Sequence, residues 1–263
     1  MTPDSQSGPA LTTPASPVLL LSDLHLPSEP SPYRAAFNAF LAGPARTASA
    51  VYILGDLFDA WIGDDIGVAD FAPECANLQT LTSHGVPVGF LHGNRDFLVG
   101  ERFAAVTGVS LLPDPSVVTL PDGPVLLAHG DTLCTDDKLY QRFRRIVHSA
   151  TLQRFFLRLP IGWRRAIARR LRAGSRARKT RDGYTPAGDI NADAVRKLLT
   201  RHAQTRLIHG HTHRPADHAL ALDGGTAGRR FVLADWRPQR MEYLACDLQG
   251  WHRRLCIAPI DPP

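Results

Sequence analysis

Five short polar clusters in the chain contain side chains that can bind divalent cations. In chain order they are Asp23-Leu-His25, Gly55-Asp-Leu-Phe-Asp59, Gly93-Asn-Arg-Asp96, His129-Gly-Asp131 and His209-Gly-His-Thr-His213. Carboxylates, an amide oxygen and imidazoles form a mixed donor set that suits several divalent metals. Two such ions about 3.5–4 Å apart stabilise charge on a phosphoryl group and lower the pKa of a bound water. The clusters therefore predict a two-metal centre for phosphoryl chemistry.

Each cluster directly follows a short apolar run. The runs cover residues 17–22, 51–54, 86–91, 125–128 and 205–208, and helical patterns occupy residues 33–41, 69–84, 97–107 and 192–202. Short apolar runs are typical of buried strands, and their alternation with helices indicates an α/β fold. Two further strands are expected at 231–234 and 242–247. Because ligands bind at the carboxyl edge of such sheets, we expect the five clusters to meet there.

The length and composition favour one core domain with an insertion. The chain has 263 residues and 44% hydrophobic side chains, enough for a substantial core. Residues 1–17, rich in Pro, Ser and Thr, are expected to form a disordered leader before a domain at 18–263. We expect no secretory signal and no membrane-spanning segment. The four cysteines lack paired spacing, which predicts buried thiols and a reducing compartment.

A basic segment interrupts the strand–helix pattern. Residues 142–181 contain 14 Lys or Arg and no Asp or Glu, although the whole chain has a net charge of only +5. Apolar residues at helical spacing from Leu139 to Leu171 predict two or three amphipathic helices, inserted at about 138–185. Their apolar face could pack as ordinary core, or form a lid that contacts anionic ligands or a membrane surface. No nucleic-acid partner is expected, because no recognition motif accompanies the basic residues.

The order and chemistry of the five clusters resemble the calcineurin-like metallophosphoesterase superfamily over residues 23–213. The resemblance implies a β-sandwich flanked by helices, and we expect the inserted helices to form a lid on it. It implies that one metal is bound by Asp23, His25, Asp56 and His213. It implies that the other is bound by Asp56, Asn94, His129 and His211, with Asp56 bridging the two. We expect His209, Asp59 and Asp131 to support these ligands.

Arg95 departs from the pattern of the superfamily, in which many members carry His at this position. An Arg cannot donate a proton near neutral pH, but its fork of N–H donors holds phosphate oxygens. A phosphate leaving group needs no proton, because its second pKa is about 6. Arg95 therefore favours cleavage of a phosphoanhydride over cleavage of a simple monoester.

Residues 55–65, 93–97, 129–137 and 209–215 resemble more narrowly the UDP-2,3-diacylglucosamine diphosphatase family of lipid A biosynthesis. This resemblance implies hydrolysis at the α-phosphorus of a lipid-linked UDP-sugar, with two Mn²⁺ ions, in a Gram-negative bacterium. The products would be UMP and 2,3-diacylglucosamine 1-phosphate. We expect a cytoplasmic monomer, peripheral on the anionic inner membrane. Two alternatives stay open: a related phosphodiesterase or nucleotide-sugar hydrolase with a soluble substrate, and a metal-bearing interaction module without catalysis.

The same resemblance implies a set of substrate-binding residues. They are Asn94, Arg95, Asp137, Arg172, Ser175, Lys179, Arg181 and His211. Ser175 matches the serine of the family, whereas the register differs after it, at Lys179 and Arg181. For Asp137, capping of a lid helix is the alternative role.

Overall fold

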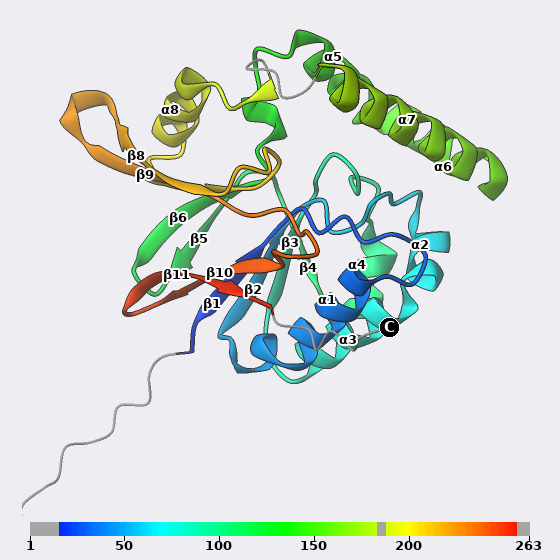
Figure 1. Ribbon diagram of the computed structural model, residues 1–263, viewed down its shortest axis with the longest axis horizontal. Helices are drawn as coiled ribbons and strands as arrows, with labels where there is room; N and C mark the ends of the chain where they lie inside the picture. Colours follow the sequence, from blue (N-terminus) through cyan, green and yellow to red (C-terminus); the bar gives the residue numbers. More distant parts are fainter. Residues whose placement is uncertain (1–15, 183–187, 257–263) are drawn as a thin grey trace, which may run out of the picture.

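Two β-sheets packed face to face form the centre of the molecule (Figure 1). The computed structural model describes residues 16–182 and 188–256, apart from the side chains of Arg176 and residues 178–182. The first sheet has the order β11 (Gly250–Leu255), β10 (Glu242–Asp247), β1 (Val18–Leu21), β2 (Ala50–Leu54), β3 (Val88–Leu91) and β4 (Ser110–Leu112). The second has the order β5 (Ser116–Leu120), β6 (Gly123–Ala128), β7 (Arg206–His209), β9 (Ala227–Val232) and β8 (Ala216–Ala221).

Parallel strands in both sheets point their carboxyl ends toward one edge of this sandwich. Strands β1 to β4 are mutually parallel, and so are β6, β7 and β9. The turns after them meet, since the backbone N–H of His211, after β7, donates to the carboxylate of Asp23, after β1. The topology thus brings the carboxyl ends of strands from two sheets to one place.

Side chains along each central strand alternate between two separate cores. In β1, Val18 and Leu20 pack between the two sheets, whereas Leu19 and Leu21 pack under the helices of the first sheet. Both faces of such a strand are buried, so its sequence shows a continuous apolar run rather than a polar alternation.

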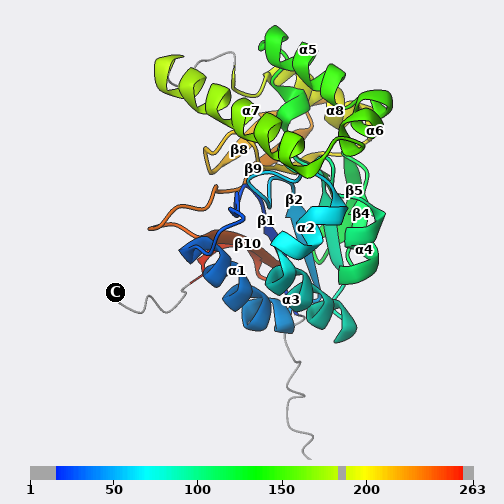
Figure 2. The same cartoon turned by 90° about the vertical axis from the view of Figure 1, so that its right-hand side faces the viewer.

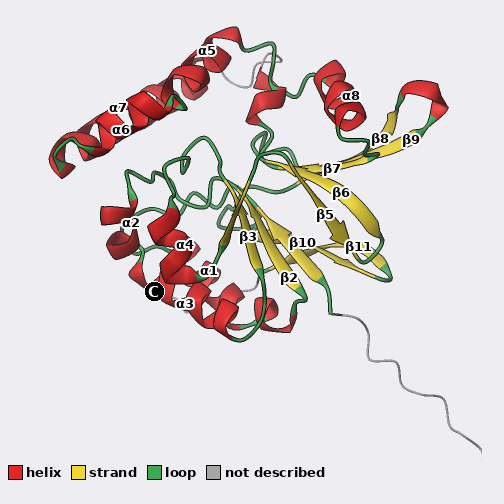
Figure 3. Cartoon of the chain, turned by 180° about the vertical axis from the view of Figure 1, so that it is seen from behind, coloured by secondary structure: helices red, strands yellow, loops and turns green. Residues whose placement is uncertain are grey.

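Helices cover the outer faces of both sheets (Figure 3). The first sheet is covered by α1 (Pro32–Ala42), α2 (Asp64–Asp70), α3 (Ala72–Ser83) and α4 (Glu101–Thr107). The second is covered by α8 (Ala192–Arg201). Short 3₁₀ turns occur at Pro44–Thr47, Asp131–Leu133 and Asp223–Gly225. This architecture confirms the predicted α/β sandwich flanked by helices.

Three further helices extend over the edge where the strands end (Figure 2). They are α5 (Lys138–Val147), α6 (Ala150–Leu157) and α7 (Ile161–Asp182), and we call them the helical lid. Arg164 of α7, a buried side chain, donates to Asp65 at 2.8 Å, and Arg165 pairs with Asp70 at 3.1 Å, so the lid is attached to α2. Among the residues described, none of the helices has the length and apolarity of a membrane span.

Several predicted limits differ from the structure. The pattern at 69–84 predicts one helix, but the chain bends at Phe71, whose φ and ψ of −116° and 34° are not helical and whose ring is buried. The helix predicted at 97–107 begins at Glu101, because the carboxylate of Asp64 accepts from the N–H groups of Gly100 and Phe103 at 2.9 and 3.1 Å. Strands β4, β5, β8 and β11 were not predicted. The limits 18–263 for the domain and about 138–185 for the insertion stay predictions, and residues 1–15 of the predicted leader lie outside the described residues.

Candidate active site

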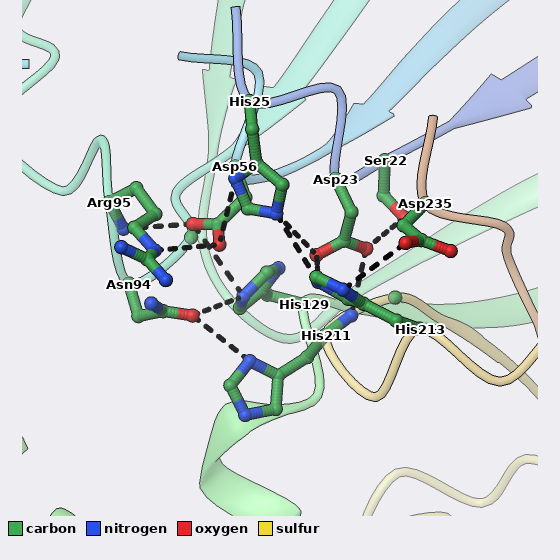
Figure 4. Close-up of polar contacts among 12 residues, drawn as sticks. Ser22, Asp23, His25, Asp56, Asn94, Arg95, His129, His211, His213 and Asp235 are labelled. Atoms are coloured by element: carbon green, nitrogen blue, oxygen red, sulfur yellow. Dashed lines mark hydrogen bonds and ion pairs between the residues drawn. The ribbon is translucent and has the colours of Figure 1, made fainter. Parts of the chain in front are cut away.

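The seven predicted metal ligands lie in the turns that follow the carboxyl ends of the central strands (Figure 4). Five of them have positive φ angles, which residues other than glycine rarely adopt: Asp23, His25, Asp56, His211 and His213. Among the other non-glycine residues described, Ala203 alone shares this property. Backbone strain persists only where surrounding contacts impose it, and it gathers at functional sites. The backbone of these turns therefore adopts a rare conformation that holds the predicted ligand side chains in position.

Close backbone approach holds neighbouring turns together. A Cβ atom at Gly93 would collide with Asp56, and one at Gly210 would collide with Asp23. Glycine at these two positions therefore allows the turn after β3 to contact that after β2, and the turn after β7 to contact that after β1.

Asp23, His25 and His213 form the first ligand group. The Nε2 atoms of the two histidines are 3.2 Å apart, and Oδ1 of Asp23 lies 3.3 Å from Nε2 of His213. The other oxygen, Oδ2, accepts from Ser22 Oγ at 2.6 Å and from the N–H of His211 at 2.8 Å. Oδ1 is buried and has no donor in hydrogen-bond geometry among the described residues. Since an unpaired buried carboxylate oxygen is costly, this atom fits a cation ligand.

Asn94, His129 and His211 form the second ligand group. Oδ1 of Asn94 lies 3.1 Å from Nε2 of His129 and 2.9 Å from Nδ1 of His211. Nδ1 of His129 lies 2.8 Å from the backbone oxygen of Leu54, to which it donates when Nε2 is left free for a ligand.

Asp56 lies between the two groups. Its Oδ2 is 3.8 Å from Nδ1 of His25, and its Oδ1 is 3.9 Å from Nε2 of His129. The N–H of Arg95 donates to Oδ1 at 2.8 Å, and the guanidinium Nε is 3.8 Å from Oδ2. Each oxygen of one carboxylate therefore faces a different group, as the predicted bridging role requires.

A buried carboxylate beneath the site, Asp96, holds two of the turns in place. Its oxygens accept from the backbone N–H groups of Asp56 at 3.2 Å, Leu57 at 2.8 Å, Phe58 at 3.4 Å and Gly93 at 2.8 Å. The positions of Asp56 and of the Gly93–Asn94 turn therefore depend on this side chain.

The site is a buried acidic centre. Burial, together with the charges of Asp96 and Asp23, raises the pKa of Asp56 to about 7. Burial alone would lower the pKa of His129, but Asp56 and Asp23 raise it to about 9, and Asp23 contributes to a pKa of about 9 for His213 as well. Positive charge is thus stabilised among these carboxylates.

Two sets of three residues each bring their potential ligand atoms within 4.8 Å of one another. One set is Asp23, His25 and His213, and the other is Asp23, Asp56 and His129. Oxygen and imidazole donors around buried negative charge suit divalent cations. The residues therefore fit the divalent metals that the clusters predict.

The predicted supporting carboxylates, Asp59 and Asp131, bind the helical lid. Asp59 pairs with Arg172 of α7, and Asp131 accepts from Tyr140 Oη at 2.7 Å and from Arg144 Nε at 2.6 Å, both on α5. The turns that carry Asp59 and Asp131 also carry predicted ligands, so the lid is attached directly to the site.

Two other residues lie behind the ligands. Nδ1 of the buried His209 is 2.8 Å from the oxygen of Gly210, and its Nε2 is 3.3 Å from Arg230, so its contacts fix the turn before His211. Asp235, which the motifs missed, lies 3.4 Å from Nδ1 of His213. Asp235 follows β9, which is parallel to β7 and ends at the same edge of the sheet. The rule that functional residues follow the carboxyl ends of parallel strands would therefore have predicted Asp235 as well.

A cavity of about 740 Å³ lies between the lid and the core. Most of its lining is apolar and comes from the lid, including Leu139, Phe143, Leu152, Phe155, Phe156 and Leu171. Of the predicted substrate-binding residues, four line it: Asn94, Arg95, Arg172 and Ser175. Since Asn94 belongs to a ligand group, the cavity begins at the candidate metal centre.

Two of the remaining predicted substrate-binding residues, Asp137 and His211, do not line this cavity. The carboxylate of Asp137 caps α5, accepting from the N–H of Tyr140 at 3.0 Å, which is the alternative role considered for it. His211 lies in the second ligand group. The side chains of Lys179 and Arg181 lie outside the described residues.

The calcineurin-like phosphoesterase family model matches residues 16–215, and the chain belongs to this family. The UDP-2,3-diacylglucosamine hydrolase of Serratia proteamaculans (strain 568) is 47% identical over 218 residues, which cover 83% of this chain and 90% of that protein. The enzyme of the same name from Pseudomonas paraeruginosa (strain DSM 24068 / PA7) is 46% identical over 235 residues, covering 89% and 92%. Among solved structures, Vacuolar Protein Sorting 29 from Cryptosporidium parvum aligns with a TM-score of 0.44 and 15% identity, covering 94% of each chain.

Proposed function

We propose that this chain hydrolyses UDP-2,3-diacylglucosamine, the substrate in the names of its relatives. Water attacks the α-phosphorus, and the bond from this phosphorus to the bridging oxygen breaks. The products are UMP and 2,3-diacylglucosamine 1-phosphate. The observation that carries this proposal is the apolar cavity beside the candidate metal centre.

The cavity suits a ligand with both a diphosphate and acyl chains. Its volume of about 740 Å³ lies within the range of small-molecule sites, and its apolar lining is on the lid. Each methylene group that an acyl chain buries there contributes about 0.8 kcal/mol. At the other end, Asn94 and Arg95 lie where the diphosphate would meet the metal centre. A soluble nucleotide sugar would leave the apolar part unused.

Arg95 supports cleavage of a phosphoanhydride. Its guanidinium is paired with Asp56, with Nε 3.8 Å from Oδ2, and Arg95 also lines the cavity, so its fork of N–H donors lies beside the position proposed for the phosphate oxygens. Two Mn²⁺ ions at the site would supply Lewis acidity and a water of lowered pKa. The departing sugar phosphate takes the electron pair of the broken bond and needs no proton, which agrees with an Arg at this position.

The helical lid also suits contact with an anionic membrane on its cytoplasmic side. Several large apolar side chains of the lid are exposed, including Leu139 at 76%, Phe155 at 63% and Trp163 at 67%. They lie among basic side chains, a combination that favours binding in the interface of an anionic bilayer. A substrate with acyl chains would then pass from the membrane into the cavity.

The proposal is tested by phosphorus NMR of UDP-2,3-diacylglucosamine hydrolysis in ¹⁸O-labelled water with Mn²⁺. We expect one ¹⁸O in UMP and none in the sugar phosphate, with no turnover in EDTA or in the Asn94→Ala variant. Label in the sugar phosphate would contradict attack at the α-phosphorus. A UDP-sugar without acyl chains that reacts equally well would favour an enzyme with a soluble substrate.

A further inference from the structure

The loop after β9 is fixed to the candidate site on both sides of Asp235. Before it, the N–H of Leu233 donates to the oxygen of His209 at 2.8 Å. After it, the N–H of Trp236 donates to the oxygen of Asp23 at 3.1 Å, and the Trp236 ring packs in the core. The backbone of this loop is therefore positioned by the same turns that carry predicted ligands.

The carboxylate of Asp235 is 8% exposed and has three cationic or imidazole neighbours. Arg237 Nε donates to one oxygen at 2.7 Å, and Arg240 donates to the other at 2.6 Å. Nδ1 of His213 lies 3.4 Å from the oxygen that also receives Arg237. The two arginines belong to one tight turn, in which each backbone N–H donates to the other's carbonyl at 2.9 Å. Each oxygen of the carboxylate is thus held by an arginine, which fixes its orientation.

The two ring nitrogens of His213 face different partners. Nδ1 faces Asp235, whereas Nε2 lies 3.3 Å from Oδ1 of Asp23 and 3.2 Å from Nε2 of His25 (Figure 4). A proton on Nδ1, donated to Asp235, leaves the lone pair of Nε2 directed toward the first ligand group. A carboxylate behind a histidine ligand fixes the tautomer and increases the basicity of the ring.

We propose that Asp235, held by Arg237 and Arg240, is a positioning residue that sets the affinity of the metal in the first ligand group. The inference rests on the proposed two-metal function. The second ligand group has a different orienting contact, from Nδ1 of His129 to the backbone oxygen of Leu54. A carboxylate polarises an imidazole more strongly than a neutral carbonyl does. Because Asp235 contacts His213 of the first group and His129 has its own partner, loss of Asp235 should weaken the binding of the first metal and leave that of the second unchanged.

The test is a Mn²⁺ titration of the full chain, freed of metal, by calorimetry and by the EPR signal of unbound Mn²⁺. The wild-type protein is expected to bind two ions. In Asp235→Asn, one ion should bind about 10- to 100-fold more weakly, as is typical when such a partner is lost. The other ion should bind within about twofold of its wild-type affinity. Asp247→Asn is the matched control, since Asp247 also lies 3.4 Å from a histidine, His252, on the remote β10–β11 hairpin.

A merely structural role of Asp235 predicts a different result. The metal-free variant would then melt at a lower temperature, while both Mn²⁺ affinities would equal those of the wild type, and this outcome would overturn the inference alone. A wild-type protein that binds no Mn²⁺ would overturn the proposed metal centre and the inference together. If Asp235→Asn does not fold, Arg240→Gln replaces it, because this side chain is partly exposed. That variant should weaken the same ion by about 2- to 10-fold. Two unchanged affinities in Arg240→Gln would refute the inference.

Discussion

Replacing Asp96 by Asn should destabilise the protein and displace the candidate site. The two carboxylate oxygens accept four backbone N–H groups, from Asp56 and Gly93 on Oδ1 and from Leu57 and Phe58 on Oδ2. An amide has one oxygen, so its NH₂ group must face two of these donors. The cheaper orientation places NH₂ at Oδ2, where one bond is short, at 2.8 Å, and the other is long, at 3.4 Å.

Loss of the short bond to a charged acceptor costs about 2–3 kcal/mol, and loss of the long one about 1 kcal/mol. Burial raises the pKa of Asp96, so the neutral amide recovers part of this loss, and we expect Asp96→Asn to lower the free energy of unfolding by about 2–3 kcal/mol, a substantial part of the about 5–15 kcal/mol of a typical domain. Because Asp56 and the Asn94 turn shift with it, turnover should fall by about 100-fold or more.

The assay is urea unfolding followed by circular dichroism in EDTA, so that bound metal does not mask the loss. Asp193→Asn is the control. Asp193 is exposed and pairs with Arg196 within its own helix, so this change should cost less than about 1 kcal/mol. A loss below about 1 kcal/mol in Asp96→Asn would refute the account of Asp96 as the acceptor that holds both turns.

Three further changes test the cavity, the metal site and the thiols. Asn94→Ala removes the oxygen shared by two histidines, so hydrolysis should be abolished while the far-ultraviolet spectrum stays the same; full activity would contradict the site. Phe143→Asp puts a charge on the cavity wall and should raise KM for the diacylated substrate by about 10-fold or more, with little effect on a soluble diester; equal effects on both would count against the lid. Burial raises the pKa of three thiols to about 12, those of Cys75, Cys134 and Cys246. Their thiolate fraction at pH 8 is thus about 10⁻⁴, so these thiols should react very slowly with iodoacetamide. Mass spectrometry should find the folded protein labelled at Cys256 at most. Rapid labelling of the other three cysteines would contradict their burial.

The central strands and the ligand turns could be predicted from the sequence for one physical reason. Strand β2 packs Val51 and Ile53 under the helices and Leu54 between the sheets, so the run is apolar up to the last strand residue, and Gly55 and Asp56 follow it. Burial on both faces marks the strand, and the first polar residue marks its carboxyl end. The prediction of buried thiols is confirmed for Cys75, Cys134 and Cys246, whereas Cys256 is only partly buried.

The four strands that were not predicted are the edges of the two sheets: β4 and β11 in the first, β5 and β8 in the second. An edge strand is only half covered, so its sequence mixes exposed and buried residues. In β8, for example, half-buried and exposed positions alternate through residues 216–221, and Asp217 and His218 interrupt any apolar run. Local sequence does not separate such a segment from a loop.

Ion pairs between segments that are distant in the sequence could not be predicted from it either. The basic segment suggests contact with anionic ligands, but the choice among its arginines depends on how the lid folds onto the core. Arg164 and Arg165 pair with α2, and Arg172 pairs with Asp59. Among the described side chains of α7, these three arginines are thus bound to carboxylates of the protein itself.

These ion pairs also explain why the lid and the candidate metal centre form one unit. Asp59 lies three residues after the predicted bridging ligand, Asp56, and accepts Arg172 of α7. Asp131 lies two residues after His129 and accepts both Tyr140 and Arg144 of α5. A movement of either lid helix therefore pulls on a turn that carries a predicted ligand. A ligand that fills the apolar cavity and spreads α5 from α7 would act on Asp56 and His129 through these carboxylates, so the proposed binding of acyl chains would be mechanically linked to the geometry of the candidate phosphoryl site.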